Sequence, residues 1–359
     1  MTDADANANA NEHHHIALVG AGPIGLELAA ALKRAGFDYV HFEKAQVGQT
    51  MFLWPPETHW FSSNERIAIA GVPLLTTDQT KATREQYLAY LRTVVQTFQL
   101  DVRTYEPVID IHRDPETARF TLVTQPAAGT RRCSADRLVL AVGDTDLPRT
   151  LDIPGEDLPH VSHSLHDPHR YFRNRVLVVG GKNSAAEAAL RLYHVGARVT
   201  LSYRGESLQN RGIKAWVLPE LQGRIARGEI LAHFNTRPTR ITPTHVALEP
   251  AGSHDPPGAP VDLPADFVLL MTGYLADMTL FRKAGVTLQG QRQIPRYDPE
   301  TMMTDVPNLY VAGTAVAGTQ QNYSVFLENC HIHVDRILAH LQGGPPPREH
   351  RKWAGAPET

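Results

Sequence analysis

The chain is poor in cysteine, in net charge and in long apolar runs. Its two cysteines, Cys133 and Cys330, are too few for the disulfide framework of a small secreted protein, and no Cys-x-x-Cys pair occurs. A formal net charge of −3 provides no basic surface, so we expect neither nucleic acid nor an anionic membrane as a partner. No apolar run approaches the length of a membrane span, and the polar, acidic first residues are unlike a signal peptide. We therefore expect a cytoplasmic protein.

The composition otherwise describes an ordinary globular protein with two appended ends. With 359 residues, 42% of them apolar, the chain can form two domains with their own cores. Residues 1–14 are rich in Asp, Ala and Asn, and residues 343–359 in Gly, Pro and charge, so both are predicted to be disordered. We interpret His13–His15 as part of the solvated lead-in rather than as a metal site, because no group of cysteines or carboxylates accompanies it in the sequence.

Residues 16–43 contain every part of a dinucleotide-binding βαβ unit in the right order. An apolar strand leads into Gly20, Gly22 and Gly25, an Ala- and Leu-rich helix follows, and a second strand ends at Glu43. The glycines permit a tight turn, close approach of a pyrophosphate to the backbone, and close packing of the helix, while the acid can accept hydrogen bonds from a ribose. This unit predicts one bound dinucleotide.

A second unit of the same kind spans residues 176–204. Gly180, Gly181 and Ala185 keep the turn and the packing position, although Lys182 stands where the second motif glycine would be. Ser184 and Glu187 have the spacing of a capping box. This strand ends at Arg204, whose guanidinium can pair with a 2′-phosphate, so NADP is favoured over NAD. Arg211 and Lys214 could add positive charge.

The segments around these units predict one domain inserted into another. A capped helix is expected at 83–98, opening with Thr83 and Gln86; short strands follow through 102–143, with Cys133 in a turn. Apolar strands end at Gly273 and Gly313, and a final helix is expected from Tyr323 to Leu341. The prediction is an α/β protein with two Rossmann-like domains: residues 15–150 with 274–342, and the inserted residues 151–273.

Several stretches resemble one family closely. They are HFEK (41–44), TREQYLAYLR (83–92), HDPHRYF (166–172), VVGGKNSAAEAAL (178–190), TGY (272–274), ETMMTDVPNLYVAG (300–313) and FLEN (326–329). They are similar to the YpdA-type bacillithiol disulfide reductases, flavoproteins related to low-molecular-weight thioredoxin reductases, over nearly all of residues 16–341. The resemblance implies FAD in the first domain, NADPH in the second, a homo-oligomer, and a small-molecule or small-protein electron acceptor. It also accounts for Lys182, because the family's second motif resembles GGKNSA.

One position departs from the family. Its members typically carry a cysteine in the first glycine loop, and here that position is Ile24. A thiolate at a helix start beside a flavin could attack a disulfide, whereas isoleucine cannot. Cys330, expected more than a turn inside the last helix, and His59, a possible proton donor, are weak catalytic candidates, so the cofactors are expected to perform the chemistry.

The predicted cofactor sites follow from the two glycine loops, the strand ends and the resemblance. The last helix, around Thr314–Val316 and Tyr323, is expected to stabilise negative charge on the flavin. The FAD site is predicted to comprise Gly20, Gly22, Pro23, Ile24, Gly25, Glu43, Lys44, Thr50, Phe61, Ser62, Val108, Ala141, Val142, Gly143, Gly313, Thr314, Ala315 and Val316. The NADPH site is predicted to comprise Gly180, Gly181, Lys182, Asn183, Ser184, Ala185, Arg204, Lys214 and Gly273. No metal site is predicted.

Two alternatives to a disulfide reductase stay open. A flavin-dependent NADPH monooxygenase also combines two such units, and residues 158–169 partly resemble its linker pattern Phe-x-Gly-x-x-x-His. Leu158 and His160 replace the Phe and Gly there, and His163 lies close to the remaining position. The other alternative is a nucleotide-binding redox sensor that has lost its thiol acceptor site, which Ile24 would explain.

Overall fold

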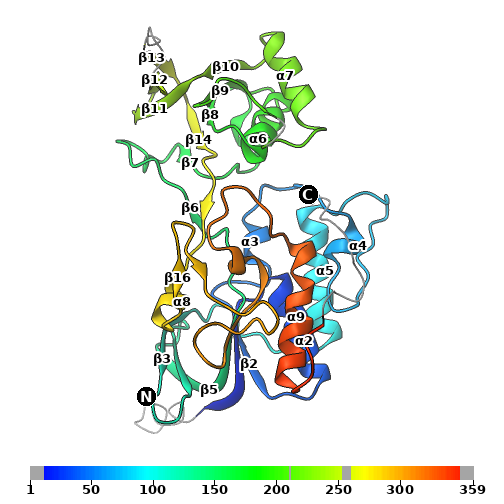
Figure 1. Ribbon diagram of the computed structural model, residues 1–359. Helices are drawn as coiled ribbons and strands as arrows, with labels where there is room; N and C mark the ends of the chain where they lie inside the picture. Colours follow the sequence, from blue (N-terminus) through cyan, green and yellow to red (C-terminus); the bar gives the residue numbers. More distant parts are fainter. Residues whose placement is uncertain (1–11, 210–211, 253–259, 348–359) are drawn as a thin grey trace. The chain divides into compact units, whose positions relative to one another are not determined.

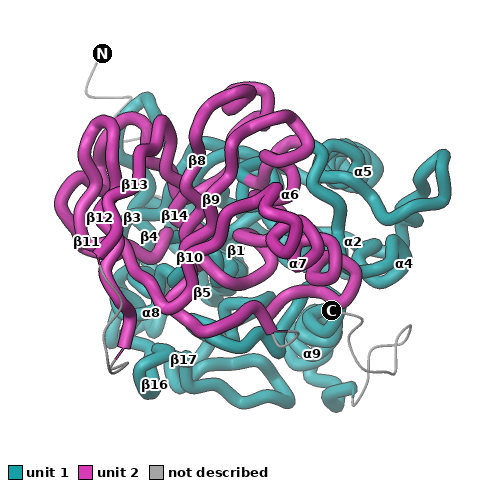
Figure 2. The backbone as a smooth tube through the Cα atoms, turned by 90° about the horizontal axis from the view of Figure 1, so that it is seen from above, with its two compact units in different colours: residues 1–53, 57–147, 274–359 teal, residues 54–56, 148–273 magenta. Residues whose placement is uncertain are grey.

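The computed structural model describes residues 12–209, 212–252 and 260–347, and the chain divides into two compact units (Figure 2). Unit 1 contains the chain up to Leu53, Glu57–Leu147, and the chain from Tyr274 onward. Unit 2 contains Trp54–Pro56 and Pro148–Gly273. Most of unit 2 is therefore one insertion, and the assignment of one cofactor to each unit stays a prediction.

Unit 1 combines a parallel sheet with helices and an antiparallel extension (Figure 1). Its elements are β1 (His13–Val19), α2 (Pro23–Arg34), β2 (Tyr39–Phe42), α3 (Gln49–Phe52), α4 (Asn64–Ile67), α5 (Arg84–Thr97), β3 (Val108–Arg113), β4 (Phe120–Thr124), β5 (Arg131–Leu140), β15 (Tyr274–Leu275), α8 (Thr279–Lys283), β16 (Leu288–Gln289), β17 (Ile294–Pro295), β18 (Leu309–Val311), the 3₁₀ helices η2 (Gly313–Ala317) and η3 (Leu327–Asn329), and α9 (His331–Leu341). Strand β6 (Leu147–Pro148) lies where the chain passes into unit 2.

Strand β5 organises the sheet of unit 1. Its first half pairs antiparallel with β4, and its second half lies between β1 and β18, parallel to both. Val19 and Val311 both pair with Leu140, so β1, β5 and β18 end at the same level. Helix α2 packs against α5 and α9. The predicted return of the chain to the first sheet is thus confirmed, and it brings residues near 20, 141 and 313 to one edge.

Unit 2 is built on a five-stranded parallel sheet in the order β10-β9-β8-β14-β7. Its elements are β7 (Val161–Ser162), the 3₁₀ helix η1 (Pro168–Tyr171), β8 (Arg175–Val179), α6 (Asn183–His194), β9 (Arg198–Tyr203), α7 (Leu218–Ala226), β10 (Leu231–Phe234), β11 (Thr236–Ile241), β12 (His245–Pro250), β13 (Val261–Pro264) and β14 (Phe267–Leu270).

Successive side chains of β8 point to opposite faces of the sheet, and unit 2 has a hydrophobic core on each face. Val176 and Val178 pack with the alanines of α6, whereas Leu177 and Val179 pack with Val246 and its neighbours in the antiparallel sheet β11-β12-β13. A strand that is apolar on both faces must be covered on both. Helices therefore cover one face of the parallel sheet and the small sheet covers the other.

Helix α5 confirms the predicted capping box. The Thr83 hydroxyl accepts a hydrogen bond from the Gln86 backbone N–H, and the Gln86 side chain accepts one from the Thr83 N–H. Tyr87, Leu91 and Val94 are buried, as the helical spacing predicts, and Tyr90 is buried with them. No described helix has both the length and the apolar character that a membrane span requires.

Two expectations near the N-terminus are wrong. His13–His15 begin β1 rather than forming a solvated lead-in, because His13 and His14 pair with Ser134 and Ala135 of β5. Cys133 lies inside β5 and is buried, not in a turn. Residues 1–11 and 348–359, which hold the rest of the predicted disordered ends, lie outside the described residues.

Two helix starts also differ from prediction. The N-cap of α6 is Lys182, so Ser184 lies inside the first turn and the predicted capping box with Glu187 is wrong. The long terminal helix α9 begins at His331, not at Tyr323. The side-chain amide oxygen of Gln320 accepts hydrogen bonds from the backbone N–H groups of Ser324 and Val325, which holds this segment outside a helix.

Candidate dinucleotide sites

Three loops of unit 1 meet at one edge of the parallel sheet. They follow β1 (Gly20–Gly25), β5 (Ala141–Gly143) and β18 (Gly313–Val316), and these strands end in register. Ligands of open α/β sheets bind beyond the carboxyl ends of the strands. The structure thus brings together the predicted FAD residues of three distant segments.

The three glycines of the first loop have different surroundings. Gly20 has a φ of +103°, and a Cβ there would lie 2.4 Å from the Ala141 carbonyl oxygen. A Cβ on Gly25 would lie 2.0 Å from the Gly20 oxygen. A Cβ on Gly22 would meet nothing within 4 Å. Two glycines are thus required by packing, while open space at Gly22 fits the approach of a pyrophosphate to the backbone.

Glu43 is held in place by the loop that it faces. The residue directly follows β2 and is buried; its two carboxylate oxygens accept hydrogen bonds from the N–H groups of Ala21, at 2.7 Å, and Ala45, at 3.0 Å. A carboxylate can accept about four hydrogen bonds, so two acceptor positions are left for a ribose diol. The residues present in this loop therefore fit the adenosine end of FAD.

Some predicted FAD residues already have other partners in unit 1. The Lys44 ammonium pairs with Asp146, and the Ser62 hydroxyl donates to Glu328 at 2.9 Å. The Phe61 carbonyl accepts a hydrogen bond from Lys81. Thr50 lies in α3 and Val108 begins β3. Their assignment to the FAD site stays a prediction.

The third loop is fixed from α9. The Gly313 N–H donates to Nδ1 of His333 at 3.2 Å, so this N–H is not free for a flavin. Burial lowers the pKa of His333 to about 3, which keeps the ring neutral and able to accept. A Cβ on Gly313 would lie 3.6 Å from the Cβ of Ile24, so the first and third loops touch at the position of the missing cysteine.

Asp144 lies beside the third loop and is not among the residues predicted from the sequence. It follows Gly143 and is buried, and it accepts hydrogen bonds from Gln320, at 2.8 Å, and from Thr314. Burial raises its pKa despite these hydrogen bonds. The available signal was an acid placed directly after a strand-ending glycine.

The weak catalytic candidates have unsuitable surroundings. Cys330 is the N-cap of α9 and fully buried, not inside the helix, and burial raises the pKa of its thiol well above the usual value. Burial also raises the pKa of Cys133, to about 12. His59 is exposed, with Nδ1 2.9 Å from the Lys81 carbonyl oxygen. A nucleophilic cysteine needs a lowered pKa and access, and neither thiol has them.

The glycine loop of unit 2 is more crowded than that of unit 1. Gly180 has a φ of +150°, and a Cβ there would lie 2.5 Å from the Met271 carbonyl oxygen. A Cβ on Gly181 would lie 2.2 Å from the Tyr203 ring. The Asn183 N–H donates to the Gly212 carbonyl at 3.0 Å, and its side chain accepts from the Lys214 N–H at 2.8 Å. The segment around Lys214 therefore borders the start of α6, where Ser184 and Ala185 lie.

The predicted phosphate-binding cation of unit 2 lies at a strand end. Arg204 directly follows β9 and is exposed, and β9 and β14 flank β8, so their ends meet at the edge that bears the glycine loop. Gly273, beyond β14, has open space around its Cβ position. The Lys214 ammonium lies 5.8 Å from the centre of the Trp216 ring. Arg211 lies outside the described residues. Open space and an exposed cation fit a phosphorylated nucleotide.

Comparison with known proteins places this arrangement in a family. Residues 17–313 match the family described as pyridine nucleotide-disulphide oxidoreductase. The chain belongs to this family. It is 34% identical to bacilliredoxin reductase Bdr of Bacillus subtilis over 90% of this chain and 96% of that protein. The structure of bacillithiol disulfide reductase Bdr (YpdA) from Bacillus cereus is similar with a TM-score of 0.85 at 32% identity, covering 92% of this chain and 99% of that one. A ferredoxin–NADP reductase of Ignicoccus hospitalis is 26% identical over 82% of this chain and 88% of its own length.

Membership in the family confirms the predicted class of protein. The chain is an FAD-dependent oxidoreductase that uses NADPH, with two Rossmann-like domains, and the resemblance to the YpdA-type reductases is confirmed. The individual cofactor residues stay predictions supported by the loop geometry.

Proposed function

We propose that the protein reduces a small-molecule disulfide with NADPH and that no cysteine of the chain forms a mixed disulfide with the substrate. Ile24 carries this proposal: the loop position that bears a cysteine in the YpdA-type family is here a buried alkyl side chain packed against Gly313. Both cysteines of the chain are buried, with raised pKa values. The similar proteins from two Bacillus species, named for bacilliredoxin and bacillithiol disulfide, support the substrate class.

The reaction requires no further reactant. One NADPH and one proton reduce one disulfide to two thiols and release NADP⁺. When bound, FAD and NADPH would supply the hydride and electron transfer. The chain would bind the pyrophosphate at Gly22, orient the ribose at Glu43, and hold the third loop in place through His333. Asp144 would orient the Thr314 side chain of the third loop by accepting its hydrogen bond.

The test is anaerobic NADPH oxidation with bacillithiol disulfide as the acceptor. We expect disulfide-dependent turnover in the natural protein, and the same rate within about twofold in a Cys133→Ala/Cys330→Ala variant that retains FAD. Loss of turnover in that variant would show that a protein thiol takes part. No disulfide-dependent oxidation in the natural protein would refute the substrate class. Ile24→Cys measures what the loop thiol adds.

A ferredoxin-type protein is the second candidate for the electron acceptor. The absence of a cysteine at Ile24 in the first glycine loop favours it. A reductase that passes single electrons to a protein needs no thiol, and the similarity to ferredoxin–NADP reductases extends over most of the chain. Reduction of a ferredoxin by NADPH, with none of bacillithiol disulfide, would select this function. Oxygen belongs in the same assay, because NADPH-dependent hydroxylation would instead indicate a monooxygenase.

We also propose that the protein is a cytoplasmic homo-oligomer. The YpdA-type resemblance supports both expectations. Sedimentation velocity of the FAD-loaded protein should give a particle larger than one chain. Fractionation of the native cells should recover the protein with the cytoplasmic enzymes.

A further inference from the structure

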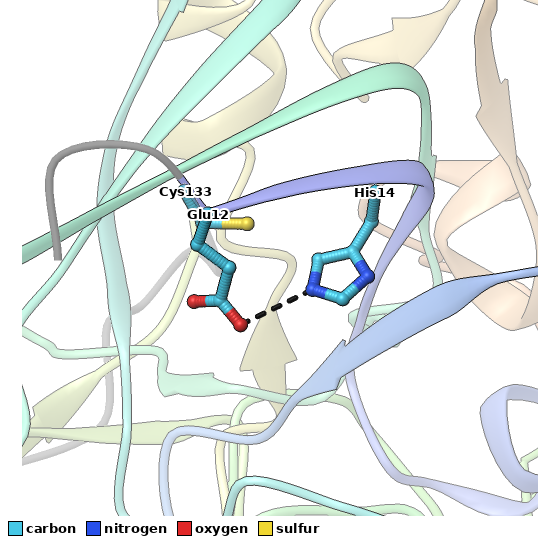
Figure 3. A group of neighbouring side chains, drawn as sticks. All are labelled: Glu12, His14 and Cys133. Carbon is cyan, nitrogen blue, oxygen red and sulfur yellow. Dashed lines mark hydrogen bonds and ion pairs between the residues drawn. The ribbon is translucent and has the colours of Figure 1, made fainter. Parts of the chain in front are cut away.

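Glu12, His14 and Cys133 meet at the N-terminal end of β1, away from the glycine loop at its other end (Figure 3). His14 pairs with Ala135 of β5, and paired residues of a sheet point to the same face. Glu12 and Cys133 each lie two residues before this pair, and alternation brings them to that face. The sheet therefore places a carboxylate, an imidazole and a thiol side by side.

The three donor atoms are close enough for one ion to join them. The carboxylate oxygen, the imidazole nitrogen and the sulfur all lie within 4.8 Å of one another, and Nε2 of His14 is 3.1 Å from Oε1 of Glu12. Zinc binds such ligands at about 2.0–2.3 Å, so two ligand atoms of a tetrahedral ion lie about 3.3–3.8 Å apart. Side-chain movements of about 1 Å would bring the three donor atoms to that spacing. Mixed oxygen, nitrogen and sulfur donors suit zinc and similar transition metals.

A second carboxylate orients the imidazole. Nδ1 of His14 lies 3.0 Å from Oδ1 of Asp38, just before β2, and this leaves Nε2 directed toward Glu12. Histidines that bind metals almost always donate their other ring N–H to a carboxylate or carbonyl group. Asp38 also accepts a hydrogen bond from the His15 N–H at 3.0 Å, which fixes it relative to β1.

One cation opposes metal binding. Arg103 pairs with both oxygens of Glu12, with Nη1 2.9 Å from Oε2, and its guanidinium lies 5.4 Å from the centre of the Phe42 ring. A metal on Oε1 would displace one of the two hydrogen bonds and leave the other in place. The Arg103 charge should then weaken the binding of a cation without preventing it.

We propose that Glu12, His14 and Cys133 form a zinc-binding site that ties the start of β1 to β5, with Asp38 as the residue that positions His14. On binding, a Zn–S bond replaces the Cys133 S–H bond, the proton passes to solvent, and no electron is transferred. Three protein ligands leave one position of a tetrahedral ion for water. The site joins β1 to β5 at the end of the sheet opposite to the dinucleotide loops, with Asp38 just before β2.

The experiment uses the FAD-loaded full chain, freed of metal by a chelator and titrated with zinc against a chromophoric chelator. We expect one zinc ion per chain. Cys133→Ser should weaken binding at least tenfold, and Asp38→Asn about 10- to 100-fold, as for other residues that orient a metal-binding histidine. Arg103→Gln should tighten binding several-fold. Cobalt in place of zinc should give a thiolate charge-transfer band that Cys133→Ser abolishes.

The matched control is His15→Ala, which removes an imidazole from the same tract but from the opposite face of β1. It should leave zinc affinity unchanged. FAD content and the thermal midpoint of each metal-free variant show whether it is folded. Equal affinities in the natural protein and in folded Cys133→Ser would overturn the proposal. A loss of binding in His15→Ala alone would show that the exposed histidines bind zinc instead.

Discussion

The two glycine loops of this chain share a position in the fold but differ in their surroundings. In unit 1, Gly22 borders open space, and the acid after the second strand, Glu43, is buried and held by two backbone N–H groups. In unit 2, Gly181 is covered by the Tyr203 ring, and the cation after the second strand, Arg204, is exposed.

This difference shows that the glycine pattern alone does not reveal what each glycine does. A glycine can be required because protein atoms occupy the Cβ position, or because a ligand does. Gly25 and Gly181 belong to the first kind, whereas Gly22 has the surroundings of the second. The residue after the second strand of each unit then differs in kind: Glu43 fits a preformed ribose site, and Arg204 fits an exposed phosphate site.

The largest expected effect comes from Gly25→Ala. Its new Cβ would lie 2.0 Å from the Gly20 carbonyl oxygen, so the helix or the loop must move. We expect the apo-protein to lose about 3 kcal/mol or more of unfolding free energy, measured by urea unfolding, and to bind no FAD. Gly22→Ala should change the unfolding free energy by less than about 0.5 kcal/mol but weaken FAD binding. Similar stability losses in both variants would contradict the distinction between the two glycines.

A buried ion pair behind the first loop is expected to have the next largest effect. Nδ1 of His331 lies 2.6 Å from Glu27 Oε2, in α2, and Nε2 lies 2.9 Å from the Arg66 carbonyl oxygen. Both partners accept, so both ring nitrogens carry hydrogen and the ring is charged. Burial lowers the pKa of His331, but the hydrogen bond and charge of Glu27 outweigh it and raise the pKa overall. Glu27→Gln should cost about 3 kcal/mol of unfolding free energy at pH 6, because it leaves a buried charge unpaired.

The pH dependence of the unfolding free energy tests whether His331 is charged in this pair. The His331 pKa is higher in the folded state than in the unfolded state, where it is near 6.5. The stability that this difference contributes is fully present at pH values below the unfolded-state pKa, and it is lost as the pH rises through the folded-state pKa. The stability difference between the natural protein and His331→Gln should therefore shrink from pH 6 to pH 9 in urea titrations. A His331→Gln difference that grows with pH would contradict the charged pair.

The fold could be predicted largely because its signals are local. Glycine turns, apolar strands and the Thr83–Gln86 capping box each lie within a few residues, and the structure has the corresponding elements. The errors arise where a side chain competes for the backbone or where a distant strand orders a segment. Gln320 keeps residues 324 and 325 out of a helix, and the pairing of His13 and His14 with β5 orders a polar tract.

The sites were predictable in part for the same reason. Glu43 and Gly313 follow the ends of apolar strands, and ligands of open α/β sheets bind beyond the carboxyl ends of such strands. Asp144, His333 and the group of Glu12 with Cys133 depend on partners that are 20 to 176 residues away in sequence, and no spacing in the chain indicates those contacts. Contacts between segments that are far apart in the sequence depend on how the chain packs, and local sequence patterns do not show that packing.

The smallest expected effect concerns Arg204 and tests the contrast with Glu43 directly. Because Arg204 is exposed at the end of β9, its removal should leave the fold intact and affect only the 2′-phosphate of NADPH. Arg204→Ala should weaken NADPH binding by about 1.5–3 kcal/mol, the value of a charged hydrogen bond, and leave NADH binding unchanged. Fluorescence titration with both nucleotides measures this, with Glu43→Gln as the control that should weaken FAD binding but not NADPH binding. An equal loss for NADH and NADPH would mean that Arg204 contacts a part that the two nucleotides share, and the exposed cation would then not account for a preference between them.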